Sequence, residues 1–300
     1  MVYTEIKEKN GRKYYYRVKS IRKGNKVNKK RIYLGTNLKR KELKLKESKA
    51  DVELVFLNNL LNKEETSFLK KIQRSYLNEP HKTIENRYEH FCALFTYNST
   101  AIEGNTFTLQ DTAHLLFDNM VPSSKSLREI NEILNHKKAF DFLLNYKGDI
   151  SSKIICKLHS LVVQNTLKPE LKSQIGGYRT VQVFIRGVEF LPAKPSEVAK
   201  EMKSLILRYS KYKKDLHPLV LASYFHIVFE IIHPFVDGNG RVGRLLMNFI
   251  LHKNNYPMIN IPNSIKIDYY KALEEAQIRN NFRPFIELLL KILRENAIIF

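Results

Sequence analysis

The chain has 300 residues, of which 43% are hydrophobic, and a formal net charge of +21 at pH 7. It can therefore bury a substantial core, in one large domain with an appendage or in two modest domains. Its two cysteines are too few for a disulfide framework or a cysteine zinc site. The charged N-terminus lacks the apolar run of a signal peptide, and the most apolar stretch, Leu219 to Ile232, is too short for a bilayer span. We therefore expect a cytoplasmic protein that makes no membrane contact.

The positive charge is concentrated at the N-terminus. Residues 1–50 contain 18 Lys and Arg but only 4 Glu, which gives this segment a net charge of +14. Such a field produces a general affinity for polyanions, but it does not by itself specify a nucleic-acid function.

The first forty residues have the pattern of β structure. Tyr14 to Val18 and Arg31 to Leu34 are β-prone runs, and Gly24-Asn25 between them is a turn signal. Two or three antiparallel strands bury little surface alone. We therefore expect a small basic β element over residues 1–45 that packs on the rest of the chain or binds something. The charged run from Lys39 to Lys49 is a candidate helix start.

From Asp51 onward the apolar spacing is helical, and we expect one mostly α domain over residues 50–300. One helix begins near Val52. Further helices are predicted at about 84–103, 127–144, 152–166, 196–212, 217–232, 240–253, 266–280 and 284–298. Residues 176–190 interrupt this pattern, because they are β-prone, contain bounding glycines and precede prolines. They predict a hairpin inserted in an otherwise α domain.

The most informative stretch is residues 233–244, HPFVDGNGRVGR. Gly238 and Gly240 permit a tight turn, so that amide groups at a new helix N-terminus converge on one point and favour an anion. Arg241 and Arg244 lie three residues apart and project from one helix face. Two guanidinium groups beside an amide nest suit a polyphosphate.

Two further residues of this stretch suit phosphate chemistry. Asp237 stands where a carboxylate would hold Mg²⁺ beside phosphates, and His233 is suited to take a proton near neutral pH. Each feature taken singly is more often structural, since a Gly-Asn-Gly turn is usually only a turn. Their combination within twelve residues is specific.

This stretch matches the Fic family signature HxFx(D/E)GNGRxxR at every position, and the resemblance covers roughly residues 55–295. Gly177-Tyr178-Arg179 with Val183-Phe184-Ile185 resembles the β-hairpin flap of that family. The resemblance implies a Fic-type helical bundle with a flap. It also implies a protein adenylyltransferase, which uses ATP and Mg²⁺ to put AMP on a Ser, Thr or Tyr hydroxyl of a protein.

The resemblance implies a role for each matching residue. His233 would be the general base that deprotonates the target hydroxyl for attack on the α-phosphate. Asp237 would hold the Mg²⁺ that bridges the α- and β-phosphates. Gly238, Asn239 and Gly240 would form the anion nest, and the Asn239 side chain would also contact the α-phosphate. Arg241 and Arg244 would hold the β- and γ-phosphates. Tyr269 and Tyr270 would lie near the adenine.

A second stretch, residues 99–105 at the end of the predicted helix 84–105, resembles the (S/T)xxxE(G/N) inhibitory motif of many Fic proteins. Ser99 and Glu103 would share one helix face. The implied mechanism is an ion pair of Glu103 with Arg244 that occupies the position of the γ-phosphate and misaligns ATP. The same glutamate can support the reverse reaction, removal of AMP. The alternative is that Glu103 is an ordinary exposed charge.

Several alternatives stay open. The edge of the flap, Val183, Phe184, Ile185 and Arg186, would pair with an extended target segment, or the hairpin is purely structural. The resting activity is AMP addition, AMP removal, or transfer of another nucleotide or a phosphate. Self-modification and a homodimer are compatible with the sequence. Residues 1–45 are a nucleic-acid module or, as their composition favours, a solvated basic sheet that docks a partner or its own core.

Overall fold

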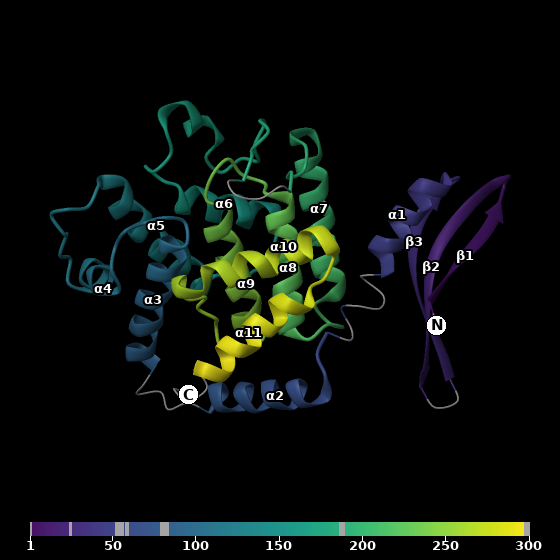
Figure 1. The fold of residues 1–300 in the computed structure, drawn as a ribbon, viewed down its shortest axis with the longest axis horizontal. Helices are drawn as coiled ribbons and strands as arrows, with labels where there is room; N and C mark the ends of the chain where they lie inside the picture. Colours follow the sequence, from purple (N-terminus) through teal and green to yellow (C-terminus); the bar gives the residue numbers. More distant parts are fainter. Residues whose placement is uncertain are drawn as a thin grey trace. The chain divides into compact units, whose positions relative to one another are not determined.

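The computed structural model describes residues 2–23, 26–51, 57, 60–78, 84–185 and 190–296. The chain divides into two compact units, Met1–Glu64 and Glu65–Phe300. Each unit is described by itself (Figure 1).

The first unit is a three-stranded antiparallel sheet followed by a helix. Its strands, in the order β1-β2-β3, are Val2–Lys9, Arg12–Lys23 and Lys26–Thr36, and helix α1 spans Arg40–Asp51. Asn10 and Gly11 both have positive φ (52° and 70°), as a tight turn between β1 and β2 requires. The two predicted strands are therefore confirmed. The predicted turn at Gly24-Asn25 lies outside the described residues.

Arg17 of β2 anchors helix α1 to the sheet. Its guanidinium donates two hydrogen bonds of 2.7 Å to the carboxylate of Asp51, and it also reaches Thr4 of β1 at 2.9 Å. Because Thr4 and Arg17 are directly opposed in the ladder, they lie on the same face of the sheet, and α1 packs on that face. The opposite face carries Tyr16 and Tyr33, which are also directly opposed.

The second unit is a bundle built around two central helices, α8 and α9. Most side chains of both helices are buried. This is expected for α8, which is apolar on most of its surface, whereas α9 also buries polar side chains, among them Asn239, Arg241 and Arg244. Helices α3, α5 and α6 pack on α9, and α7, α10 and α11 pack on α8 (Figure 1). The helices α2 to α11 span Lys63–Leu77, Ile84–Ala101, Leu109–Phe117, Leu127–Asn145, Ser152–Val162, Pro195–Tyr212, Pro218–Ile232, Asn239–Lys253, Lys266–Arg279 and Arg283–Asn296.

The predicted mostly helical fold is confirmed, and helices α3 and α5 to α11 coincide with predicted ones. Helices α2 and α4 were not predicted from the sequence. Helix α4 has a recognisable start, because Thr108 and Asp111 form a capping box in which each side chain accepts from the backbone of the other. The helix predicted near Val52 begins outside the described residues.

The segment predicted to form a hairpin, residues 176–190, differs from that expectation. Its described residues, 176–185 and 190, are in turns and loop and contain no strand. A two-stranded hairpin is marginal in water without a third strand or a packed face, and Phe184 is 80% exposed. The backbone is held instead by the side chain of Arg179, as described below. Arg186 lies outside the described residues.

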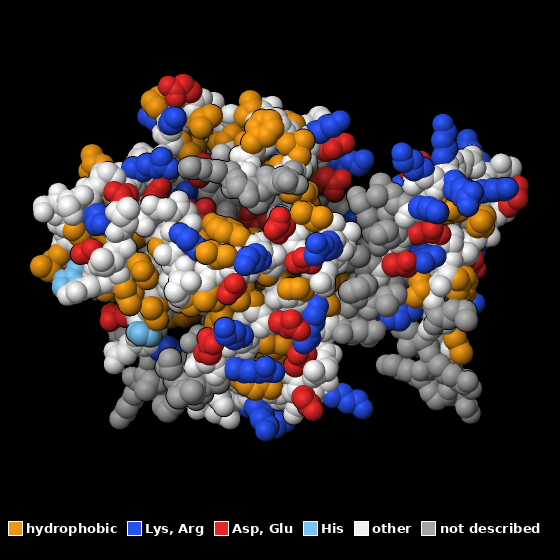
Figure 2. Space-filling view, in the orientation of Figure 1, with side chains coloured by type: hydrophobic (Ala, Val, Ile, Leu, Met, Phe, Trp, Pro, Cys, Tyr) orange, Lys and Arg blue, Asp and Glu red, His pale blue; other side chains and the backbone are white. Residues whose placement is uncertain are grey.

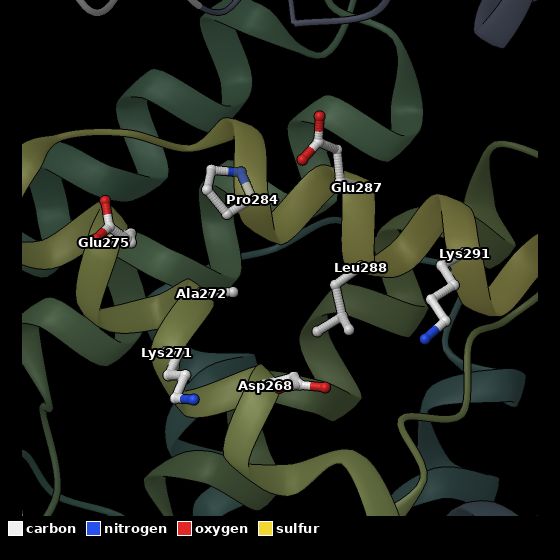
Figure 3. Close-up of a pocket in the computed structure, with 8 residues that line it drawn as sticks. All are labelled: Asp268, Lys271, Ala272, Glu275, Pro284, Glu287, Leu288 and Lys291. Atoms are coloured by element: carbon white, nitrogen blue, oxygen red, sulfur yellow. The ribbon is translucent and has the colours of Figure 1, made fainter.

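Two features of the described part of the chain complete the fold. None of its helices has the length and apolar character of a membrane span. A depression of about 290 Å³ lies between α10 and α11, with Asp268, Lys271, Glu287 and Lys291 on its rim (Figure 3). It contains none of the residues of the 233–244 motif, so we do not assign it to the site.

Candidate active site

The site begins where α8 ends. His233 follows the last residue of α8 in a left-handed conformation (φ 50°, ψ 63°), and its N–H still donates to Phe229 O at 2.8 Å. Few non-glycine residues adopt this conformation, and here it turns the chain abruptly out of the helix. The backbone beyond it is fixed by Arg179, whose N–H donates to Pro234 O at 2.9 Å and whose Nε donates to His233 O at 2.8 Å.

Arg179 is the residue whose role the sequence did not reveal. It is 2% exposed, and its guanidinium also donates to the carbonyls of Val181 at 2.9 Å and Ala193. Burial lowers the pKa of Arg179, but a guanidinium stays charged at neutral pH. One side chain thus fastens the loop after residue 178 to the loop that carries His233. The only sequence signal for this role of Arg179 was its position in Gly177-Tyr178-Arg179, the stretch that resembles the flap of the family.

Phe235 and Asn239 close the loop after His233. The ring of Phe235 stacks on His159 with centroids 3.8 Å apart and planes 3° apart. The amide of Asn239 accepts from Phe235 N at 2.9 Å and donates to Phe235 O at 2.8 Å. Both polar groups of the Asn239 side chain are therefore engaged, and it is 2% exposed. A contact of this side chain with a phosphate requires one of these hydrogen bonds to open.

Two glycines at the start of α9 make the anion nest. Gly238 is left-handed (φ 78°), and a Cβ there would lie 2.8 Å from Val163. A Cβ at Gly240 would lie 2.1 Å from Glu103 Oε1 and 2.9 Å from Arg244 Nη1. The Glu103 carboxylate and the Arg244 guanidinium thus reach the N-terminal end of α9 because residue 240 has no side chain. Free backbone N–H groups at this end of a helix attract anions.

Asp237 lies at the edge of this nest. One of its oxygens accepts from Gly238 N and from Arg241 Nη2 at 3.2 Å, and the other lies 3.6 Å from Arg128. Its side chain is 35% exposed. It is therefore a charged carboxylate at the mouth of the anion nest, open on one side.

The two motif arginines are both buried, at 2% and 1% exposure for Arg241 and Arg244. Arg241 lies 3.2 Å from Asp237 and 3.8 Å from Glu132, and its Nε and Nη1 have no hydrogen-bond partner among the described residues. Buried donors without partners are rare. The free donors beside an anion nest therefore fit an absent anionic ligand.

Arg244 is held by the inhibitory stretch that the sequence predicted. Its Nε donates to Ser99 Oγ at 3.0 Å, and its Nη2 donates to Ser99 O at 2.6 Å and to Glu103 Oε1 at 2.8 Å. Helix α3 ends at Ala101, so Glu103 lies in the turn after the helix and not on its face. Burial would lower the pKa of Arg244, but the attraction of Glu103 outweighs it and the pKa lies above its ordinary value.

Comparison with known proteins places this geometry in a family. Residues 149–251, which include the whole motif, match the model of the Fic/DOC family. The chain therefore contains a segment of the Fic/DOC family. A curated relative, the protein adenylyltransferase fic-1 of Caenorhabditis elegans, is 33% identical over 66% of this chain and 39% of its own length. The protein adenylyltransferase Fic of Drosophila persimilis is 36% identical over 64% of this chain and 37% of its own length. The chain thus spans less than half the length of these relatives.

Solved structures show the same fold. A Fic-domain signalling protein from Bacteroides thetaiotaomicron superposes with a TM-score of 0.71 at 27% identity, over 78% of this chain and 94% of that chain. Fic-1 from C. elegans superposes with a TM-score of 0.70 at 25% identity, over 87% of this chain and 76% of that chain.

The two tyrosines expected near the adenine have different environments. Tyr269 is 1% exposed, and its hydroxyl lies 2.8 Å from His226 Nε2 and 3.5 Å from Arg244 Nη1. Its hydroxyl contacts the buried guanidinium of Arg244, and its ring is not accessible to a ligand. Tyr270 is 43% exposed, its hydroxyl donates to Ile102 O at 3.2 Å, and burial raises its pKa to about 12. Of these two tyrosines, only Tyr270 has exposed surface that the adenine of a nucleotide can contact.

The residues around the motif also bear on metal binding. No group of three or more His, Cys, Asp or Glu side chains in the described part of the chain could hold a metal ion. Mg²⁺ commonly takes one or two carboxylates and fills its other positions with phosphate oxygens and water. The partly exposed Asp237 fits that donor set, whereas a metal held by protein ligands alone does not.

Proposed function

We propose that this chain is a Fic-type protein adenylyltransferase, which transfers AMP from ATP to a Ser, Thr or Tyr hydroxyl of a protein. The observation that carries the proposal is that Asp237, Arg241 and Arg244 lie at the start of α9. His233 begins the loop that leads from α8 into this helix. The names of the curated relatives, protein adenylyltransferases that the chain matches over part of their length, support the same reaction.

In the proposed reaction His233 acts as the general base. Its Nε2 takes the proton of the target hydroxyl, the hydroxyl oxygen forms a bond to the α-phosphorus, and the bond from that phosphorus to the bridging oxygen of pyrophosphate breaks. A base of this kind typically contributes about 10²–10⁴-fold to the rate. Arg179 contributes indirectly, because it fixes the backbone on both sides of the His233–Pro234 peptide.

The remaining groups would bind the triphosphate. The N–H groups at the start of α9 and the unpaired donors of Arg241 would hold phosphate oxygens, and Arg244 would hold the γ-phosphate. Asp237 would hold Mg²⁺, which when bound neutralises charge on the phosphates. Fixed dipoles and cations of this kind stabilise a transition state without reorganisation.

The proposal assigns Arg244 to the γ-phosphate, and in the structure this arginine is paired with Glu103. Its carboxylate lies against Gly240 and pairs with Arg244. We therefore propose that this is an autoinhibited state. The same carboxylate beside the nest could orient a water for removal of AMP from a modified protein, and this reverse reaction is the alternative that the position of Glu103 favours.

The reaction class is tested with the Glu103→Gly variant, a cell lysate as the source of targets, and ATP labelled at either the α- or the γ-phosphate. Adenylyl transfer predicts protein-bound label from the α position only, and none in the Glu103→Gly, His233→Ala double variant. Label from the γ position alone would replace the proposal with phosphate transfer. Release of α-label from modified protein by the wild type would establish the reverse reaction.

A second proposal concerns the N-terminal unit: we infer that the sheet face opposite helix α1 binds single-stranded nucleic acid. This face, called here the aromatic face, combines tyrosines with basic side chains: Tyr3, Tyr14, Tyr16, Tyr33, Lys7, Lys29 and Arg31. Glu5 lies on the same face and pairs with Arg31 at 2.8 Å. The rings of Tyr16 and Tyr33 lie 5.3 Å apart, and Lys7 Nζ lies 5.7 Å from the Tyr16 ring. Figure 2 shows Lys and Arg side chains gathered on this unit. Bases stack on such rings while the cations attract phosphates.

The test compares Tyr33→Ala with Ile6→Ala in the whole chain. Both side chains are about half exposed, at 53% and 54%, but Ile6 opposes Tyr15 and so lies on the other face. A stacked base is worth about 1–3 kcal/mol, so Tyr33→Ala should weaken binding of a labelled single-stranded oligonucleotide about 5- to 150-fold, with Ile6→Ala unchanged. Equal effects of the two variants, or no salt-dependent binding by the wild type, would contradict the proposal.

A further inference from the structure

The last turn of α8 contains a carboxylate that neither the family signature nor the proposed reaction uses. Glu230 is 7% exposed and lies three residues before His233. Two effects make this position unfavourable for a charged carboxylate. Burial opposes a charged group, and the C-terminal end of a helix repels an anion. A carboxylate that persists there needs a partner, and the structure shows which group it is.

That partner is the proposed base. Glu230 Oε2 lies 3.6 Å from His233 Nδ1, and this nitrogen has no hydrogen-bond partner among the described residues. The other carboxylate oxygen, Oε1, also has none. Burial alone would raise the pKa of Glu230, but the neighbouring His233 and His226 outweigh it, so that its pKa lies below the ordinary value. Glu230 is therefore a carboxylate at neutral pH.

The second helix of the core is shaped to leave room for this carboxylate. A Cβ at Gly243 of α9 would lie 2.5 Å from Glu230 Oε1 and 2.8 Å from His226 Nδ1. Real Cβ atoms do not come this close to other heavy atoms, so any other residue at 243 would displace Glu230. The absence of a side chain at 243 thus keeps the carboxylate in reach of His233.

We propose that Glu230 is the positioning residue of His233. It accepts the Nδ1–H of the imidazole, which leaves the unprotonated Nε2 as the nitrogen that faces the substrate, and it stabilises the imidazolium formed when Nε2 takes a proton. A separation of 3.6 Å closes to a hydrogen bond with a small movement of either side chain. The inference rests on the proposed function, because it assigns a partner to the base of that reaction.

Other charged and titratable groups surround this pair, and they define what the experiment must hold constant. On α8 itself His226 lies beside Glu230. From α9 Arg244 acts on the carboxylate, and from α10 and the turn after α3 Tyr269 and Glu103 complete the polar cluster. Each variant of the NMR test therefore keeps these four residues unchanged, and the proteins compared in the kinetic test all carry the same Glu103→Gly substitution.

The first test needs no activity. The wild type, Glu230→Gln and Glu230→Asp are labelled with ¹⁵N in histidine, and the ring nitrogens of His233, assigned by its absence in His233→Ala, are titrated by NMR. An opposite charge within about 4–6 Å shifts a pKa by about 1–3 units. We expect the pKa of His233 to fall by about one unit or more in Glu230→Gln, with loss of the Nδ1–H tautomer, and to fall less in Glu230→Asp. An unchanged pKa and tautomer in Glu230→Gln would overturn the inference.

Two controls separate positioning from general damage. Glu65→Gln removes another buried carboxylate, which pairs with Arg283 far from the motif in the sequence, and should leave the His233 titration unchanged. Gly243→Ala keeps the charge of Glu230 but displaces it, and should lower the His233 pKa as Glu230→Gln does. This variant also keeps the test decisive if Glu230→Gln does not fold, because an unchanged titration in folded Gly243→Ala would equally overturn the inference.

The kinetic test is made in the Glu103→Gly background. With Glu230→Gln, kcat for AMP transfer should fall at least about tenfold while KM for ATP stays nearly constant, and the acidic limb of the pH profile should move to lower pH with the His233 pKa. If the acidic limb of the pH profile does not move in Glu230→Gln, this result would contradict the proposal that Glu230 positions His233. If the NMR shifts appear but the Glu103→Gly protein transfers no AMP at any pH, then the proposed function fails and the Glu230–His233 pair stands.

Discussion

Glu103 Oε1 lies 2.8 Å from Arg244 Nη2, although the two residues are 141 positions apart in the chain. Three features make this contact. Ser99 holds the same guanidinium by its hydroxyl and its carbonyl, Asn105 fixes the turn that carries Glu103 through hydrogen bonds to α5, and Gly240 leaves space for the carboxylate. A phosphate that approaches Arg244 must therefore displace an ordered carboxylate.

The Glu103→Gly variant should transfer AMP faster than the wild type. A hydrogen bond to a charged group contributes about 1.5–3 kcal/mol, so its removal should raise the rate about 10- to 150-fold. The measurement is incorporation of α-labelled ATP at equal protein concentration. Glu170→Gly, which removes an exposed carboxylate from a short 3-10 helix, is the matched control and should behave as the wild type. Equal rates for Glu103→Gly and the wild type would show that Glu103 is not inhibitory.

A double-mutant cycle of Glu103→Gly and Arg244→Ala should show coupling in ATP affinity. The two side chains are in direct contact, and contacting residues typically couple by about 0.5–3 kcal/mol. Arg244→Ala alone should weaken ATP binding, whereas in the absence of Arg244 the removal of Glu103 should bring little gain. Calorimetric affinities of the four proteins give the coupling energy. Strictly additive effects would mean that Glu103 and the γ-phosphate do not compete for Arg244.

In the activated background, His233→Ala should reduce AMP transfer by about 10²–10⁴-fold and leave ATP affinity nearly unchanged. The reason is that His233 accepts the proton of the target hydroxyl and is not among the groups placed around the phosphates. Transfer rate and calorimetric ATP affinity are measured on the same preparation. A parallel loss of affinity would reassign His233 to nucleotide binding.

Arg179→Ala should both destabilise the fold and slow transfer. The carbonyls of His233, Val181 and Ala193 would lose a charged donor, and a buried polar group without a partner costs about 1–3 kcal/mol. We expect a loss of about 3–5 kcal/mol in the free energy of unfolding in urea. Arg279→Ala, which removes an exposed arginine from a surface ion pair, should change it by less than about 1 kcal/mol. Similar losses in the two variants would remove Arg179 as the anchor of the loop.

Stability should decrease as pH falls through the range from about 6.5 to 4. Burial lowers the pKa of His159, His217 and His226 to about 4, whereas in the unfolded chain it lies near 6.5. Below pH 6.5 the unfolded state therefore binds protons that the folded state does not, which costs about 2 kcal/mol per histidine at pH 5. The loss levels off below pH 4, where both states are protonated. Urea unfolding at pH 7 and pH 5 measures it.

The variant His217→Asn isolates one of these contributions. His217 caps α8 by accepting Leu219 N at 3.2 Å through Nδ1, and Asn is an equally good cap that does not titrate. The difference in unfolding free energy between pH 7 and pH 5 should therefore shrink by about 2 kcal/mol. The exposed His90→Asn serves as control. An undiminished difference in His217→Asn would mean that this histidine does not carry the pH dependence.

The sequence by itself determined those features that depend on near neighbours in the chain. The helices followed from apolar spacing, and the anion nest followed from Gly238 and Gly240 before an apolar helix, because a turn and the helix after it are set by consecutive residues. Helix α4 was predictable for the same reason, because Thr108 and Asp111, which form its capping box, are only three residues apart in the sequence. The contact of Glu103 with Arg244 was predicted only by family resemblance, as no spacing links two residues so far apart.

Tertiary structure alone decided what each polar side chain contacts. Tyr269 and Tyr270 are neighbours in sequence, yet one is buried against His226 and the other is partly exposed, because successive residues of a helix point in directions about 100° apart. Asn239 closes its own loop, and Glu230 lies in reach of His233 because Gly243 of the neighbouring helix leaves room. These outcomes depend on the packing of helix against helix, which fixes distances between residues that the order of the chain leaves free.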